Sequence, residues 1–259
     1  MRTMGRVSAI VGVVVCVVAC AACTRGGDPA SSGSTSGADD AARTIAVYLA
    51  RDGKVAPVRR VIHAPQEEAV SSALDALTHT RPTAEERSAG YVNAVPPRRG
   101  DVEVAGGVAR VVTEAGPLSR LAQAQVVYTL TDLPGVERVA FVVDGREGRP
   151  LTGHDFEAET PQILVRSPLP GETVRSPIRL EGTANVFEAT VSIDVRNARG
   201  AILERAFTTA TSGTGTRGTF DTSVDVAAQP GDVTVVAYEA SAKDGSQLHV
   251  VEVPLELTR

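Results

Sequence analysis

The side chains best suited to metal binding or acid–base catalysis are few and scattered. The histidines are His63, His79, His154 and His249. None lies in an HExxH motif or in a close pair, the arrangements in which two histidines on one helix face bind zinc. The sequence therefore predicts no metal site.

Three carboxylates could in principle flank a sugar as a pair of catalytic acids, namely Asp132, Asp144 and Asp155. Asp132 stands beside Leu133-Pro134 and Asp144 precedes Gly145, so turn formation is the better interpretation for both. Serine is plentiful, but there is no GxSxG elbow to support a hydrolase triad. We expect no enzyme and no catalytic residues.

Cofactor and nucleic-acid sites are equally poorly supported. Gly106-Gly107 opens no phosphate-binding loop, and Asp244-Gly245-Ser246 lacks the further acids of a calcium loop. A net charge of -5 gives no basic footprint for nucleic acid. The tyrosines are spread along the chain, which argues against a stacking platform for bases or sugars; they are Tyr48, Tyr91, Tyr128 and Tyr238.

The cysteines carry the clearest chemical signal, because all of them fall within the first 23 residues. Arg2 and Arg6 precede an apolar run over 7–22, which is shorter than the roughly 20 residues of a membrane span. This pattern predicts a secretory signal peptide over 1–22. The sequence VVACAAC resembles a bacterial lipobox, whose cysteine is lipidated and becomes the new N-terminus. Cys23 is the favoured position and Cys20 the alternative.

The segment that follows, 23–42, is rich in Ser, Gly, Ala and Asp and cannot bury enough apolar surface to fold. We interpret it as a flexible tether. The expected location is extracytoplasmic, on the outer face of the cell membrane and held there by the N-terminal lipid. A plainly secreted protein is the alternative, and the mass of the mature N-terminus would distinguish the two.

The first folded unit is expected over 43–150. Alternating apolar residues predict a hairpin around Asp52-Gly53, followed by a helix over 66–78 whose first turn carries Glu67 and Glu68. A second hairpin turns at Gly106-Gly107. The stretch 121–145 then predicts an amphipathic helix, a Pro-Gly turn and a strand that is apolar on both faces, as interior strands are.

The runs VYL…DGK…PVRR, GGVARVV and LAQAQVVYTLTDLPGVERVAFVVDG resemble the GerMN domain of spore-germination and sporulation proteins. The resemblance covers about 105 residues and implies an α+β domain, a mixed sheet with two main helices similar to ring-building motifs. One departure is the short segment between Val112 and Leu118.

A polar linker is expected over 151–160, and a second unit over 161–259. About seven short alternating strands separated by Pro-Gly and Asp-Gly turns predict an all-β immunoglobulin-like sandwich. The runs SPLPGETVRSPIRLEGTANVFEATVSIDV, GTFDTSVDV and ASAKDGSQ resemble the Gmad2 domain, which is found beside GerMN domains.

These domains imply a non-enzymatic adaptor or scaffold in an extracytoplasmic assembly, with envelope proteins or a second copy as partner. Binding of cell-wall glycan or peptide is the alternative, although aromatics make up only 3% of the chain, and a wall hydrolase is less favoured. The Ala-, Arg- and Val-rich, Lys-poor composition is typical of an actinobacterium, so a role in sporulation does not follow from the domain names.

Overall fold

The computed structural model describes residues 42–79, 81–97, 102–114 and 116–259, which belong to one compact unit, Ala38–Arg259. The predicted signal peptide, both candidate lipidation cysteines and the tether as far as residue 41 lie outside the described residues. None of the helices in the described part is long and apolar enough to cross a membrane.

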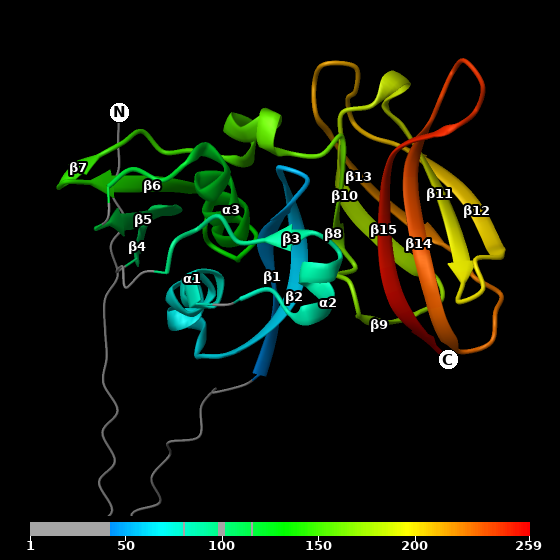
Figure 1. The fold of residues 1–259 in the computed structure, drawn as a ribbon, viewed down its shortest axis with the longest axis horizontal. Coiled ribbons are helices and arrows are strands. Elements are labelled where there is room, and N and C mark those ends of the chain that lie inside the picture. Colours follow the sequence, from blue (N-terminus) through cyan, green and yellow to red (C-terminus); the bar gives the residue numbers. More distant parts are fainter. Residues whose placement is uncertain (1–41, 80, 98–101, 115) are drawn as a thin grey trace, which may run out of the picture. The chain divides into compact units, whose positions relative to one another are not determined.

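An antiparallel sheet opens the first domain (Figure 1). Its strands, in the order β2-β1-β3, are β1 (Ala42–Arg51), β2 (Lys54–His63) and β3 (Tyr91–Val92). The predicted hairpin is present, and Asp52 and Gly53 both adopt positive φ in its turn. Val47, Tyr48 and Leu49 are fully buried on β1, so this strand lies at the centre of the domain.

Two of the helices in this domain begin at side-chain caps. The helices are the 3-10 turn η1 (Gln66–Glu68), α1 (Ala69–His79), α2 (Ala84–Ser88) and α3 (Arg120–Thr131). The hydroxyl of Ser119 accepts from the Ala122 amide at the start of α3, and Thr83 and Glu86 form a capping box on α2. Both predicted main helices are therefore present.

The remaining strands of this domain form a second sheet rather than joining the first one. In the order β4-β5-β6-β7 they are β4 (Val102–Ala105), β5 (Val108–Thr113), β6 (Arg138–Val143) and β7 (Arg146–Glu147). β5 and β6 are parallel and joined through α3, while the other pairs are antiparallel. The expected α+β class is confirmed, with its strands divided between two sheets.

The segment expected as a linker is built into the first domain. Leu151 forms a bridge with Val139 of β6, and the 3-10 helix η2 (Gly153–Glu159) carries the fully buried Phe156. Although the segment is polar in composition, Leu151 and Phe156 are both buried and attach it to the first domain.

The second domain is a sandwich of a three-stranded sheet, β13-β10-β8, and a five-stranded sheet, β12-β11-β14-β15-β9 (Figure 1). The strands are β8 (Ile163–Ser167), β9 (Thr173–Arg175), β10 (Ile178–Ala184), β11 (Thr190–Asn197), β12 (Ile202–Thr209), β13 (Gly218–Val224), β14 (Gly231–Ala240) and β15 (Gln247–Thr258). A short 3-10 turn, η3 (Phe187–Ala189), precedes β11. The predicted all-β immunoglobulin-like architecture is confirmed.

Two hydrophobic cores result. One lies under β1, α1 and α3, and the other lies between the two sheets of the sandwich. The buried side chains of Leu164 on β8 and Leu169 belong to the first core, although their backbone belongs to the second domain. The sandwich is therefore joined to the α+β domain by apolar packing as well as by the chain.

Candidate binding site

The side chains considered for chemistry do not converge in the structure. Among the described residues there is no group of three or more His, Cys, Asp or Glu side chains placed to hold a metal ion. His79 lies near Asp75, one helical turn earlier on α1, and His249 lies 3.8 Å from Glu239. The other two histidines stand on separate elements, β2 and η2.

Each of the three aspartates proposed as possible sugar-cleft acids has a separate structural role. Asp132 is the C-cap of α3 and forms an ion pair with Arg166. Asp144 adopts positive φ in the β6–β7 turn. Asp155 accepts from the Thr152 amide, and its pKa is lowered first by a hydrogen bond from Arg149 and then by that amide. They form no acid pair.

The expectation that the tyrosines stay apart is wrong for one pair. The rings of Tyr48 and Tyr128 lie 5.3 Å apart between centroids. Tyr48 is fully buried and the hydroxyl of Tyr128 is hydrogen-bonded to Thr160, so the pair is part of the core and offers no open face to a ligand. The residues are distant in sequence and only the packing of α3 on β1 brings them together.

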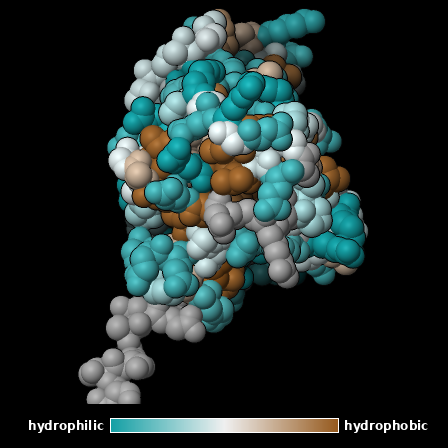
Figure 2. All heavy atoms as spheres, turned by 90° about the vertical axis from the view of Figure 1, so that its left-hand side faces the viewer, coloured by the Kyte–Doolittle hydropathy of each residue, from teal (hydrophilic) through white to brown (hydrophobic). Residues whose placement is uncertain are grey.

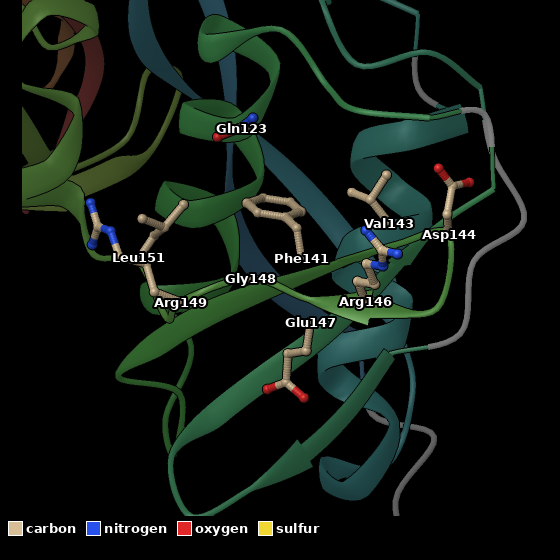
Figure 3. Close-up of a pocket in the computed structure, with 9 residues that line it drawn as sticks. All are labelled: Gln123, Phe141, Val143, Asp144, Arg146, Glu147, Gly148, Arg149 and Leu151. Atoms are coloured by element: carbon tan, nitrogen blue, oxygen red, sulfur yellow. The ribbon is translucent and has the colours of Figure 1, made fainter.

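One hollow, of about 750 Å³, lies beside the β6–β7 hairpin (Figure 3). Phe141 and Leu151 supply apolar walls, and α3 contributes Gln123. Its charged groups are largely engaged elsewhere, since Glu147 pairs with Arg110 and Arg149 Nη2 donates to Asp155 Oδ1 at 2.6 Å. Nothing converges on the centre of this hollow, so it defines no ligand.

The surface on this side of the first domain is mixed in character. Figure 2 shows hydrophobic patches separated by hydrophilic side chains. Exposed apolar residues of β4 and β5 include Val104 and Val112.

A second cavity, of about 710 Å³, is a better candidate and is called the groove below. It lies between the β1–β2 hairpin, β8 and β15. Its lining combines aliphatic residues with charged and polar ones, and its aromatic side chains are Tyr91 and His249. The lining includes Val55, Ile163, Val165, Val250 and Glu252.

Alternate residues of β15 have backbone groups that point away from its partner strand β14. Pro254 O accepts from the Gly171 amide at 2.8 Å, and Glu256 N donates to Glu172 O at 2.9 Å, so both groups face away from β14. Backbone groups on a strand alternate in direction with a period of two. The N–H and C=O of Glu252 therefore point to the same free side.

The facing strand, β8, is the edge of its own sheet. Gln162 O accepts from the Asn185 amide at 2.8 Å, which directs residue 162 toward β10. By the same alternation the N–H and C=O of Ile163 and Val165 point away from β10. Ile163 is fully buried and Val165 is 2% exposed, so the edge beside the groove that is open for pairing is that of β15, at the exposed Glu252.

The charged residues around the groove are nearly balanced in sign, and His249, which lies 3.8 Å from Glu239, also lines it. Lys54 donates to Ala158 O, and the Arg51 guanidinium lies 5.7 Å from the centre of the Tyr91 ring. Asp52 and Glu252 add two carboxylates at the rim. The groove consequently favours apolar and backbone contacts over a strongly charged ligand.

These groove residues were seen in the sequence only as parts of strands. One available signal is Pro254, since a proline within a strand is tolerated at an edge or where its nitrogen faces away from the ladder. The meeting of hairpin, β8 and β15 depends on tertiary structure and has no local sequence signature.

The fold is that of an α+β domain followed by an immunoglobulin-like sandwich, and its best candidate site is the groove beside the exposed edge of β15. Residues 46–149 match the Germane family model, described as sporulation and spore germination. Residues 162–246 match the Gmad2 family model, described as an immunoglobulin-like domain of bacterial spore germination. The chain carries a Germane (GerMN) domain followed by a Gmad2 domain, as the resemblance implied. No curated protein matches the chain.

Proposed function

We propose that this protein is a non-enzymatic adaptor of the cell envelope that holds an extended segment of another envelope protein in the groove. The germination-related domain families support a role in assembly rather than in catalysis. The observation that carries the proposal is the exposed edge of β15 at Glu252, which borders a groove with several aliphatic lining residues. An added strand satisfies such an edge and places alternate side chains against the aliphatic lining.

The same observation favours polypeptide over glycan. Sugar sites commonly use aromatic faces with several converging polar side chains, whereas the aromatic side chains of the groove are Tyr91 and His249. The backbone donor and acceptor of Glu252, on the exposed edge of β15, suit pairing with another backbone. Cell-wall glycan is therefore the weaker candidate, and a wall peptide remains compatible with the groove.

The adaptor is proposed to act on the outer face of the membrane, anchored by lipid at Cys23, with Cys20 as the alternative. The support is the sequence alone: a positive n-region, an apolar run and the VVACAAC segment. The tether after Cys23 would give the folded part reach above the membrane surface.

A site-specific cross-linking experiment tests the groove. A photoreactive amino acid replaces Val250, which is 46% exposed in the groove, or Val112, which is 40% exposed on β5. The full chain is expressed in its native membrane and irradiated. We expect a discrete cross-linked partner from position 250 and none from position 112.

Glu252→Pro serves as the blocking variant. It removes an N–H that faces away from β14, and Pro254 shows that the strand accepts proline in this orientation. We expect this substitution to abolish the cross-link from position 250 while leaving the melting temperature nearly unchanged. A cross-link that survives Glu252→Pro in a folded protein would contradict strand addition.

A further inference from the structure

A different surface, the outer edge of β12, offers a second strand edge for association. β12 is the terminal strand of the five-stranded sheet and lies at its free edge (Figure 1). The amide of Ala210 donates to Ala189 O at 2.8 Å, on the β11 side. Alternation along the strand then directs the N–H and C=O of Arg205 and Phe207 away from β11.

The side chains beside these free backbone groups are unusual for a solvent-exposed edge. Phe207 is 73% exposed, the largest exposed fraction among the large hydrophobic side chains of the described residues. Edge strands are generally protected by charged side chains, proline or bulges. β12 carries the charged residues Glu204 and Arg205 and a register shift at its Ile202 end, but Glu204–Thr209 pairs regularly with β11 and has no proline.

Arg205 is held in place beside Phe207 on the outer face of the sheet. Its Nε lies 3.6 Å from Asp194 Oδ1, and Asp194 is only 2% exposed. Arg196 Nη2 donates to the same carboxylate at 2.9 Å, and Tyr238 donates from its hydroxyl. Because two guanidinium groups share one carboxylate, Arg205 retains positive charge to offer a neighbour.

We infer that β12 pairs antiparallel with β12 of a second copy, about a two-fold axis through Ala206. This register places Arg205 opposite Phe207 of the other copy, so that the two residues whose backbone groups point outward exchange both N–H···O bonds. The same pairing sets a guanidinium beside an aromatic ring at two symmetric positions. The small Ala206 lies on the axis, where the strands approach most closely.

The neighbouring registers are less favourable. An axis through Arg205 would oppose two arginines, and like charges directly opposite each other destabilise a strand pair. An axis through Phe207 would pair the two rings but would place Arg205 opposite Thr209, without an aromatic or acidic partner. Only the Ala206 register gives both outward-facing residues a complementary neighbour.

This inference goes beyond the proposed peptide binding and is independent of it. β12 ends the sheet on one side, whereas β15 lies next to β9 at the other side. Pairing through β12 therefore leaves the groove of each copy open, and the dimer would present two grooves. Two anchored binding sites would increase the avidity for a repeated or clustered partner.

Two opposite substitutions at one exposed position test the pairing and its register. Phe207→Lys places like charge opposite Arg205 of the second copy, and Phe207→Glu places an acid there. Val61→Lys is the matched control, since Val61 is 54% exposed on β2. The full-length chain is studied in nonionic detergent by sedimentation equilibrium, up to about 500 μM because edge contacts are at the small end of protein interfaces.

We expect a monomer–dimer equilibrium for the parent chain and for Val61→Lys. Phe207→Lys should raise the dimer dissociation constant by about tenfold or more, while Phe207→Glu should keep it within about threefold. A monomeric parent chain at the highest concentration would overturn the inference. So would equal constants for the two Phe207 variants, because the proposed register requires opposite responses to the two charges. Cross-linking at position 250 is unaffected by either outcome.

Discussion

Arg166 at the end of β8 donates from Nε to Asp132 Oδ1, the C-cap residue of α3, at 2.9 Å. Burial alone would lower the pKa of Arg166, but Tyr48 and Asp132 outweigh it and raise the pKa above its usual range. Burial, and then Asp132, raises the pKa of Tyr48. The guanidinium lies near the Tyr48 hydroxyl without the geometry of a hydrogen bond, so Asp132 is its main partner.

Removing this carboxylate should destabilise the fold measurably. Asp132→Asn leaves Arg166, whose side chain is 43% exposed, without an ionised partner, and we expect a loss of about 0.5–1 kcal/mol in the free energy of unfolding. Urea denaturation of the full chain measures it. Asp221→Asn removes the exposed pair with Arg179 and should have no measurable effect. Equal effects of the two variants would show that burial at β8 contributes nothing.

A second prediction concerns Gln125, a fully buried polar residue on the apolar face of α3. Its Nε2 donates to Tyr48 O at 2.9 Å, and its Oε1 accepts from the Ala94 amide at 2.8 Å. Gln125→Leu preserves the side-chain volume but leaves Tyr48 O and the Ala94 amide without these hydrogen bonds. We therefore expect a loss of about 2–4 kcal/mol in the free energy of unfolding. Gln123→Leu, which removes one bond to Leu118 O nearer the surface, should cost less than about 1 kcal/mol. Thermal unfolding followed by circular dichroism distinguishes them.

Local patterns predicted α3, the helix that contains Gln125, and β6, the strand that follows it. They did not predict the role of Gln125 itself. The apolar spacing of α3 and the apolar run of β6 are local patterns within short stretches of sequence. The helix and the strand can therefore be predicted from periodicity. The contact of Gln125 with Tyr48 joins positions 77 residues apart. The Tyr48–Tyr128 pair and the division into two sheets depend on tertiary packing in the same way.

The groove illustrates the same limit. The sequence predicts β8 and β15 as strands, yet whether Glu252 has a free edge depends on the order of strands in the sheet. Phe156 was missed for another reason, because one apolar residue in a polar segment gives no periodicity. Its burial depends on α3 and on Arg120, whose guanidinium lies 4.4 Å from the centre of its ring.

Stability should fall in acid through Glu86. Burial would raise the pKa of Glu86, but the Arg60 hydrogen bond and the Thr83 amide together outweigh it and lower the pKa. A carboxyl with a lowered pKa in the folded state contributes stability above its unfolded pKa of about 4.3, and this contribution disappears as the pH falls through the folded value. Glu86→Gln should therefore lower the melting temperature at pH 7 and narrow the difference between pH 7 and pH 3.

The matched control for that pH profile is Glu67→Gln, a substitution of an exposed acid in the first turn of η1. It should leave the profile almost parallel to that of the parent chain. If Glu86→Gln changed the melting temperature by the same amount at both pH values, ionisation of Glu86 would not be the source of its contribution.

The lipid anchor makes a prediction about mass and location. If Cys23 is the modified residue, the mature protein should begin there and carry a diacylglycerol-sized mass increase, and Cys23→Ala should release the chain from the membrane fraction. Cys20→Ala should leave it bound. Intact mass spectrometry and membrane fractionation measure both, and the reverse pattern would assign Cys20 instead. An unmodified N-terminus would exclude the anchor.

The last prediction concerns Gly182, which sets the position of β8 and hence one border of the groove. A Cβ at this residue would lie 2.2 Å from Leu164 O and 2.5 Å from the Phe220 ring. Backbone cannot yield as a flexible side chain does, so Gly182→Ala must displace β8 from β10 at a cost of about 2–3 kcal/mol. Gly200→Ala, where φ is +79° but the space is open, should cost about 1 kcal/mol through backbone conformation alone.

If β8 borders the peptide site, Gly182→Ala should also weaken the cross-link from position 250 at temperatures where the variant is folded. If the destabilised variant cross-links as well as the parent chain, binding does not depend on the position of β8.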